Sequence, residues 1–277
     1  MDFNQIDGFL LSALREDIGA GDVTTECCVP ESAVSNGVFR AKADGVVCGL
    51  AVAARVFALT DARVVFSPSV KDGDAVKTGG VIADIFGPSR SILTAERVAL
   101  NVLQHMSGVA TAARLASEAV AGTRARIVDT RKTTPGMRVL EKYAVRTGGA
   151  YNHRFGLSDG VLIKDNHIKA AGGITNAVEC ARKAVSHTLK IEVECETREN
   201  VKEALACGAD IIMLDNMTAE EMRENVALIA GRAIIEASGN MGSRIPLREV
   251  AETGADFISV GSMTHSAAAL DISLKLN

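Results

Sequence analysis

The sequence predicts an α/β protein in which an N-terminal α+β domain precedes an incomplete α/β barrel. Two observations lead to this fold class. From residue 125 onward, short apolar runs alternate with helical stretches that begin at a capping residue and end at glycine. Over the first hundred residues, in contrast, short alternating runs are separated by Asp-Gly and Gly-Gly turns, which is the pattern of β-hairpins.

The N-terminal part begins with an amphipathic helix and continues as short strands. Ile6, Leu10 and Leu14 recur at helical spacing, and strands are predicted within GVFRAKADGVVCGL and VVFSPSVKDGDAVKTGGVIADIF. A long helical pattern from about Ser91 to Ala121 leads into the barrel. The closing DISLKLN alternates as an edge strand does, so we expect it to return to the N-terminal sheet. The predicted domains are therefore residues 1–108, joined by the tail 267–277, and residues 109–266.

Six apolar runs predict the barrel strands. They are ARIVDT, DGVLIK, KIEVEC, DIIMLDN, AIIEASG and DFISVGS, and such near-continuous runs are typical of parallel strands buried on both faces. Thr218 and Glu221 form a capping-box pattern at the start of one intervening helix, and Thr197 caps another. Six units are fewer than the eight of a complete barrel, so an incomplete barrel is expected, with a doubly wound sheet as the alternative.

Composition excludes several classes of function. The 277 residues carry a formal net charge of -4 and no Trp, which disfavours general binding to nucleic acid. The apolar runs are too short to span a membrane, and Asp2 and Asp7 are unlike the start of a signal peptide. The six cysteines lack C-x-x-C spacing, so we expect buried, reduced thiols and a cytoplasmic location. From the charge and the apolar runs we expect neither a nucleic-acid nor a membrane partner.

Positive charge is concentrated in one segment of this acidic chain. From Arg131 to Lys164 there are seven Lys and Arg residues and two acids. A solvated basic face is one interpretation of such a run. The other follows from position, because Arg131, Lys164, Glu194, Asp215, Ser238 and Gly261 all lie at or near strand ends. In either α/β architecture the C-terminal ends of the strands bind ligands, so these side chains are expected to meet around a polyanionic substrate.

The residue types at these ends suggest separate tasks. Arg131, Lys132, Arg154 and Lys164, with His153 beside them, suit carboxylate or phosphate groups. Glu194 and Asp215 close neighbouring strands and suit Mg²⁺, although salt bridges to the same cations are an equally simple explanation. SGNMGS (238–243) and SVGS (259–262) offer small residues whose backbone N–H groups can approach an anion.

These motifs together resemble quinolinate phosphoribosyltransferase (nicotinate-nucleotide pyrophosphorylase, carboxylating). The resemblance is carried by EDIGAGDVTTE, ERVALNVLQHMSGVAT, DTRKTTPGMR, YAVRTGGAYNHRFGLSDGVLIKDNHI, LDN, EASGN and SVGSMTHSAAALDIS, and it covers essentially the whole chain. It implies a seven-stranded incomplete barrel and at least a homodimer with a site shared between subunits. It also implies transfer of a phosphoribosyl group from 5-phosphoribosyl 1-pyrophosphate (PRPP) to quinolinate, with loss of CO₂, in NAD biosynthesis.

The resemblance also implies roles for particular residues. Catalytic roles fall to Lys132, Lys164, Glu194 and Asp215, and the two acids take Mg²⁺ as the cofactor. Substrate contacts fall to Arg97, which reaches the partner's site, and to Thr130, Arg131, Lys132, His153, Arg154, Lys164, Glu194 and Asp215. The ribose 5-phosphate falls to Ser238, Gly239, Asn240, Val260, Gly261, Ser262 and His265. Since no protein nucleophile is required, no general base is assigned; the two acids and His153 are the nearby candidates.

Two other functions are compatible with parts of this pattern. Lys164 at a strand end could form a Schiff base, as in barrel aldolases, but the other cations exceed what a carbonyl substrate needs. A molybdenum-transport paralogue shares the fold and much of the motif set. Binding without turnover would favour that paralogue.

Overall fold

The computed structural model describes residues 2–277, which form two compact units. Unit 1 combines the chain up to Arg114 with residues 133–149 and 263–277, and unit 2 combines residues 115–132 with 150–262. The sequence-based division assigned residues 133–149 to the barrel domain instead. They group with unit 1 because α5 (Arg138–Thr147) is tied to α4 (Ser89–Ala119), with Glu141 Oε1 2.8 Å from His105 Nε2.

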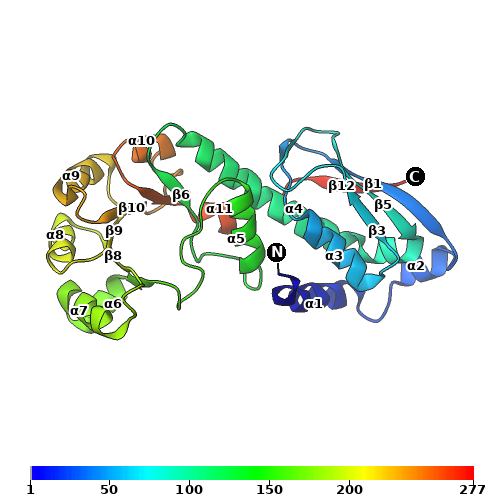
Figure 1. Ribbon diagram of the computed structural model, residues 1–277. Helices are drawn as coiled ribbons and strands as arrows, with labels where there is room; N and C mark the ends of the chain where they lie inside the picture. The colour runs from blue at the N-terminus through cyan, green and yellow to red at the C-terminus, as the bar shows by residue number, and fades with distance from the viewer. Residues whose placement is uncertain (1) are drawn as a thin grey trace. The chain divides into compact units, whose positions relative to one another are not determined.

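Unit 1 is built on a four-stranded antiparallel sheet (Figure 1). Its strand order is β12-β1-β5-β3, with β1 at Val34–Ala41, β3 at Val65–Pro68, β5 at Val81–Pro88 and β12 at Ile272–Leu276. The chain's tail therefore returns to the N-terminal sheet, as the alternating tail predicted, and Phe39 of β1 pairs with Leu274. Phe39 and Phe57 are fully buried and contact edge to face, with ring centroids 6.1 Å apart, which gives this unit a core of its own.

Unit 1 also contains several helices and two short strands. They are η1 (Phe3–Gln5), α1 (Asp7–Ile18), α2 (Val23–Cys28), β2 (Gly45–Val46), α3 (Leu50–Thr60), β4 (Ala75–Val76) and α11 (Ser262–His265), whose first residue belongs to unit 2. The long helix predicted from about Ser91 to Ala121 is α4, shifted by two residues.

Unit 2 contains the parallel sheet that the six apolar runs predicted. The strand order is β6-β11-β10-β9-β8-β7, and each strand lies within one predicted run: β6 (Arg126–Val128), β7 (Val161–Ile163), β8 (Ile191–Cys195), β9 (Ile211–Asp215), β10 (Ile234–Ser238) and β11 (Phe257–Ser259). This curved sheet is the incomplete α/β barrel.

The seventh position of the barrel is reduced to a single residue. Tyr151 makes an isolated parallel bridge to Val128 of β6, on the edge of β6 that is not paired with β11. No sheet pairing within residues 2–277 joins the Tyr151 segment to β7, so the barrel is open between them. The chain crosses this opening as an irregular segment from Asn152 to Gly160.

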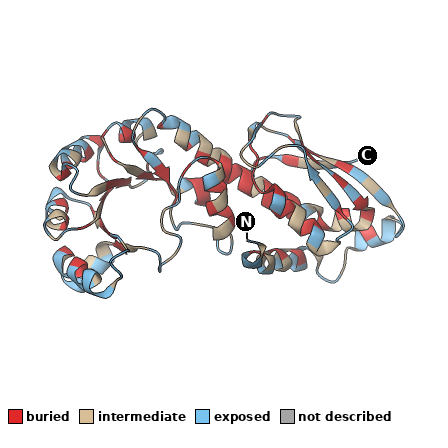
Figure 2. Cartoon of the chain, in the orientation of Figure 1, coloured by how far each residue is buried: buried red, intermediate tan, exposed pale blue. Residues whose placement is uncertain are grey.

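Helices cover the outer face of the curved sheet (Figure 1). They are α6 (Asp165–Ala171), α7 (Ile174–Ala184), α8 (Arg198–Ala206), α9 (Ala219–Ile229) and α10 (Leu247–Ala251). The predicted caps are present, because Thr218 Oγ1 accepts from Glu221 N at 3.2 Å while Glu221 accepts from Thr218 N at 2.7 Å, and Thr197 caps α8. The buried residues concentrate on the strands and on the helix faces turned toward them (Figure 2).

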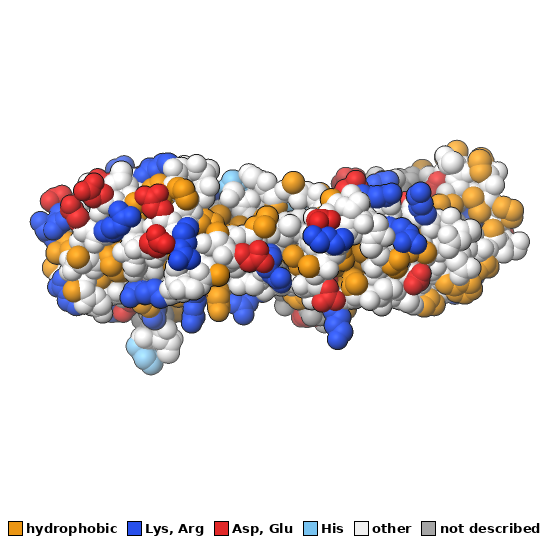
Figure 3. All heavy atoms as spheres, turned by 90° about the horizontal axis from the view of Figure 1, so that it is seen from above, with side chains coloured by type: hydrophobic (Ala, Val, Ile, Leu, Met, Phe, Trp, Pro, Cys, Tyr) orange, Lys and Arg blue, Asp and Glu red, His pale blue; other side chains and the backbone are white. Residues whose placement is uncertain are grey.

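The predictions drawn from composition fare differently. No helix among residues 2–277 is long and apolar enough to cross a membrane. Acidic and basic side chains are interspersed on the face shown in Figure 3. All six cysteines are free thiols, but the expectation that they are buried is wrong for Cys27, Cys28 and Cys180, which are exposed.

Candidate active site

A cavity of about 450 Å³ opens at the C-terminal ends of the parallel strands. Eleven of the residues predicted from the sequence line it: Thr130, Arg131, Lys132, His153, Arg154, Lys164, Glu194, Asp215, Ser238, Gly239 and Asn240. They come from segments up to 110 positions apart in the chain, and the strand ends bring them together as the parallel architecture requires. Arg131 and Lys132 line the cavity and are also exposed to solvent, so the solvated basic face stays an alternative for these two residues.

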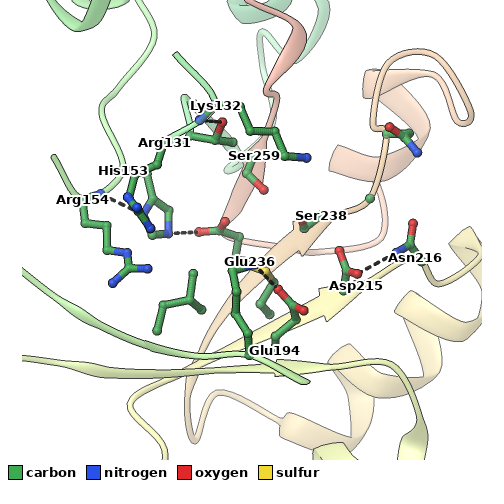
Figure 4. A pocket seen from close by; sticks show the side chains of 16 residues that line it. Arg131, Lys132, His153, Arg154, Glu194, Asp215, Asn216, Glu236, Ser238 and Ser259 are labelled. Carbon is green, nitrogen blue, oxygen red and sulfur yellow. Dashed lines mark hydrogen bonds and ion pairs between the residues drawn. The ribbon is translucent and has the colours of Figure 1, made fainter. Parts of the chain in front are cut away.

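Three of the cations, Arg131, Lys132 and Arg154, lie on the same side of the cavity (Figure 4). Arg131 and Lys132 follow β6, where the Lys132 backbone N–H donates to Thr130 Oγ1 at 3.0 Å. Arg154 lies on the segment that crosses the barrel opening, and its guanidinium donates to the Gly160 carbonyl at 3.0 Å. Burial lowers the pKa of Arg154, and the neighbouring positive charge of Arg131 lowers it further. The two guanidinium groups therefore repel each other across a site that suits an anion.

Carboxylates occupy the ends of the adjacent strands β8 and β9. Glu194 Oε2 lies 2.5 Å from Lys164 Nζ, so the predicted salt bridge is formed. Asp215 Oδ2 accepts from Asn216 Nδ2 at 2.6 Å. Both side chains line the cavity, and carboxylate oxygens are the donors that Mg²⁺ prefers. These two residues are thus compatible with a metal ion as well as with a salt bridge.

The turn after β10 brings backbone close to the cavity. Gly239 has φ +100°, and a Cβ there would lie 2.6 Å from the backbone N of Asn216 and 2.5 Å from its Oδ1. The Asn216 N–H donates to the Ser238 carbonyl at 3.1 Å, which holds the turns after β9 and β10 together. Only glycine fits this position without displacing the neighbouring turn.

A buried acid–histidine cluster forms the inner end of the cavity. His153 Nε2 lies 3.1 Å from Glu192 Oε2 and 3.4 Å from Glu236 Oε2, and the two glutamates are 3% and 4% exposed. Figure 4 shows the His153 ring facing Glu236. By donor type and proximity these three residues could also hold a metal ion, since their ligand atoms lie within 4.8 Å of one another.

The pKa values of Glu192 and His153 are both raised, for different reasons. Burial raises the pKa of Glu192, and the charge of Glu236 raises it further, although the hydrogen bond from His153 opposes them. Burial alone would lower the pKa of His153, but its hydrogen bonds with Glu192 and Glu236 raise it. The backbone N–H of Arg154 donates to His153 Nδ1 at 2.7 Å, so Nδ1 is the acceptor nitrogen of the ring and Nε2 carries the ring proton that faces the glutamates.

Five predicted residues do not line this cavity. Arg97 is exposed on α4 in unit 1. Val260, Gly261, Ser262 and His265 follow β11; Val260 is buried, and its N–H donates to the Val128 carbonyl at 2.9 Å. His265 is exposed, with Nδ1 2.7 Å from Ser266 Oγ. Their assigned roles stay predictions.

Sequence reasoning missed several residues of the site. Leu162, Met213, Asn216, Glu236 and Ser259 also line the cavity, and Glu192 and Asp129 support it from within the barrel. One signal was present in the sequence. Glu192 and Glu194 are two positions apart in one strand, so they share a face, and a charged residue in the middle of a strand buried on both sides needs a partner.

Two family models cover almost the whole chain. Residues 22–107 match the N-terminal domain of quinolinate phosphoribosyl transferase, and residues 109–275 match its C-terminal domain. A probable nicotinate-nucleotide pyrophosphorylase (carboxylating) of Bacillus subtilis is 44% identical over 99% of this chain and 94% of its own length. The probable enzyme of the same name from Synechocystis is 46% identical, covering 98% and 92% of the two chains.

Solved structures show the same fold. NadC from Streptococcus pyogenes superposes with a TM-score of 0.93 at 44% identity, and covers 100% of this chain and 98% of its own. The nicotinate-nucleotide pyrophosphorylase from Francisella tularensis superposes with a TM-score of 0.94 at 36% identity, with the same coverage.

The turn at Gly239 supplies a test of the cavity's construction. Gly239→Ala is expected to lower the free energy of unfolding by more than about 1 kcal/mol, since it adds a steric collision to the cost of a positive φ. Gly231→Ala is the matched control, because Gly231 has φ +74° and no atom within 4 Å of its added Cβ. Urea denaturation measures both variants. Equal losses of stability would show that the collision with Asn216 is relieved without cost.

Proposed function

The chain belongs to the quinolinate phosphoribosyltransferase family, and we propose that the cavity at the strand ends is where its two substrates react. The family activity joins quinolinate to PRPP, releases pyrophosphate and CO₂, and yields nicotinate mononucleotide for NAD biosynthesis. The observation that carries the proposal is that one cavity is lined by four cations and two acids, Arg131, Lys132, Arg154, Lys164, Glu194 and Asp215. Quinolinate is a dianion and PRPP carries several phosphate charges, so the two approach each other only where cations separate them.

The arginines suit the ring dicarboxylate. Arg131 and Arg154 line the same side of the cavity and repel each other, and a bound dianion relieves that repulsion. Lys132 and Lys164 add point charges that can neutralise the departing pyrophosphate. The four cations thereby bind the two substrates and lower the cost of charge that develops on the leaving group.

The carboxylates of Glu194 and Asp215 suit the ribose of PRPP. As the C1′–pyrophosphate bond lengthens, C1′ of the ribose acquires positive character, which Glu194 and Asp215 can stabilise while accepting hydrogen bonds from the ribose hydroxyls. The same two residues would hold Mg²⁺, because each offers carboxylate oxygen at the cavity wall. When bound, the metal ion supplies charge neutralisation for the pyrophosphate oxygens.

The loops after the last two strands suit the ribose 5-phosphate. Ser238, Gly239 and Asn240 line the cavity, and the backbone N–H groups of this turn of small residues can approach an anion. The segment from Val260 to Ser262, with His265, is proposed to complete this phosphate site.

Decarboxylation follows once the ring nitrogen carries the ribose. The electron pair of the breaking C2–carboxylate bond stays on C2, where the adjacent cationic nitrogen stabilises it, and C2 takes a proton from solvent after CO₂ has left. The protein has to hold the ring in place during these steps. No side chain needs to act as a nucleophile. This also disfavours a Schiff base at Lys164, whose Nζ is already paired with Glu194 Oε2 at 2.5 Å.

Turnover tests the function and the metal together. Purified protein with quinolinate, PRPP and Mg²⁺ is expected to release nicotinate mononucleotide and CO₂ in equal amounts, whereas nicotinate in place of quinolinate should release no CO₂. Excess chelator should abolish turnover, and added Mg²⁺ should restore it. Full turnover in chelator would remove the metal role of Glu194 and Asp215, and binding without turnover would favour the molybdenum-transport paralogue.

Removal of one arginine tests the binding assignment. Arg131→Ala is expected to raise the KM for quinolinate by about tenfold or more, because a hydrogen bond between charged groups contributes about 1.5–3 kcal/mol. Arg198→Ala, on the outer helix α8 and paired with Glu224, is the matched control and should leave this KM unchanged. Steady-state kinetics on variants with unchanged thermal unfolding measures the effect. An unaltered KM in Arg131→Ala would contradict the assignment.

We also propose that the active form is at least a homodimer in which Arg97 acts on the partner's substrate, in a cytoplasmic enzyme. Family resemblance supports this proposal, and so does the exposed position of Arg97 on α4. In the isolated chain an exposed arginine on a helix would have no binding role.

Subunit mixing tests that proposal. Arg97→Ala and Glu194→Gln should each be nearly inactive alone. When subunits exchange randomly, half of the dimers are mixed and each has one intact site, so roughly one quarter of the wild-type activity should return. Mixed dimers verified by mass that stay inactive would place Arg97 outside the shared site.

A further inference from the structure

The segment that carries Arg154 has little support from the sheet. Tyr151 is its last residue with sheet hydrogen bonds: its N–H donates to the Ile127 carbonyl at 2.9 Å, and its carbonyl accepts from Asp129 N at 3.0 Å. Beyond Tyr151 the chain crosses the barrel opening, beside a second cavity of about 330 Å³. Arg154 nevertheless lines the first cavity next to Arg131, which repels it. Something other than the sheet must fix it there.

Three buried carboxylates from three strands hold this segment. Asp129, directly after β6, accepts from His153 N at 2.8 Å and from Asn152 Nδ2 at 2.7 Å. Glu192 of β8 and Glu236 of β10 approach His153 Nε2 at 3.1 and 3.4 Å. None of the three acids is more than 4% exposed. Because buried carboxylates need hydrogen-bond partners, these three acids restrict the positions of Asn152 and His153.

His153 passes this anchorage on to Arg154. Its Nε2–H points to the two glutamates, while its Nδ1 accepts the backbone N–H of Arg154 at 2.7 Å. Both ring nitrogens are therefore engaged within the chain, and neither has a lone pair or proton left for a substrate. The connection runs from the strands through the imidazole to the arginine backbone, and the Arg154 side chain is then fixed by the Gly160 carbonyl.

The same geometry argues against a metal ion in the cluster. A metal bound at Nε2 would require the ring proton to be on Nδ1, where the Arg154 N–H already points. Within the described residues, Oε1 of Glu192 and Oε1 of Glu236 have no hydrogen-bond partner, so each acid is engaged with His153 through Oε2 alone.

We propose that His153 and the three buried carboxylates around it are positioning residues that hold Arg154 against the quinolinate ring, and that His153 transfers no proton in the reaction. The identity of the bound ring rests on the proposed function. The anchorage itself does not, because it is present in the chain without a ligand.

Kinetics of Glu236 variants test the positioning role. Glu236→Ala should raise the KM for quinolinate by about tenfold with little change in the KM for PRPP, since it loosens one arginine. Glu236→Gln keeps an acceptor for Nε2–H, so it should recover much of the lost affinity. Glu203→Ala is the control: Glu203 caps α7 through Thr175 N and Oγ1 and lines neither cavity, so its loss should affect stability alone. A fall in kcat with an unchanged quinolinate KM would overturn the proposal.

A double-mutant cycle shows whether the effect passes through Arg154. If it does, Glu236→Ala added to Arg154→Ala should change the quinolinate KM by less than about twofold, because the arginine it positions is already absent. Additive losses would overturn the proposal. Should Glu236→Ala fail to fold, Glu192→Gln can replace it, measured in the wild-type protein and in Arg154→Ala.

A measurement without substrate separates this inference from the proposed function. In protein labelled with ¹⁵N-histidine, the ring of His153, identified by its loss in His153→Gln, should show a protonated Nε2 and an unprotonated Nδ1. A proton on Nδ1, or tight binding of Zn²⁺ that Glu236→Ala abolishes, would overturn the anchorage. If this signature is present but quinolinate is not turned over, the substrate assignment fails and the anchorage stands.

Discussion

Several cations have to remain side by side at one end of the barrel, and the rest of the site is arranged around this constraint. Arg131 and Arg154 repel each other and Arg154 also loses hydration on burial, while the charges of Glu192 and Asp159 attract Arg154. The chain answers with fixed partners. Lys164 is paired with Glu194 at 2.5 Å, and Arg154 is held by the Gly160 carbonyl and by His153. These contacts keep the cations in place at a site that suits an anion.

The parallel sheet makes this arrangement possible. In a barrel, residues two apart in a strand share a face, so Glu192 and Glu194 both point inward, at two depths. The deeper one contacts His153 and the shallower one reaches the cavity. The register that pairs Ser238 with Asp215 likewise brings the turn after β10 against the turn after β9. One architectural rule thus places the groups that bind substrates and the groups that support them.

Much of this could be predicted from the sequence, and the failures have a physical cause. Runs such as DIIMLDN and the capping box at Thr218 are local signals, so strands and helices were found where they occur. Convergence of the strand ends followed from topology. Glu192 and Glu236 were missed because a single strand does not reveal which of its two buried faces is the barrel interior. The seventh strand could not be located in the sequence because it consists of one bridge at Tyr151. The assignment of α5 to unit 1 depends on the contact between Glu141 and His105, and hydrophobic periodicity does not predict such a contact.

The chemistry explains why a histidine at the cavity can serve to position another residue and not to transfer a proton. Ribosylation turns the ring nitrogen into a cation, and that cation stabilises the electron pair that stays on C2 when CO₂ leaves, until C2 takes a proton from solvent. The protein must then contribute position and charge more than proton transfer. An imidazole is rigid, and its two nitrogens can link a carboxylate on one side to a backbone amide on the other. At the opening of the barrel the sheet has one bridge in place of a strand. There, His153 attaches the chain to β8 through Glu192 and to β10 through Glu236. Elsewhere in the sheet, hydrogen bonds between strands provide this attachment.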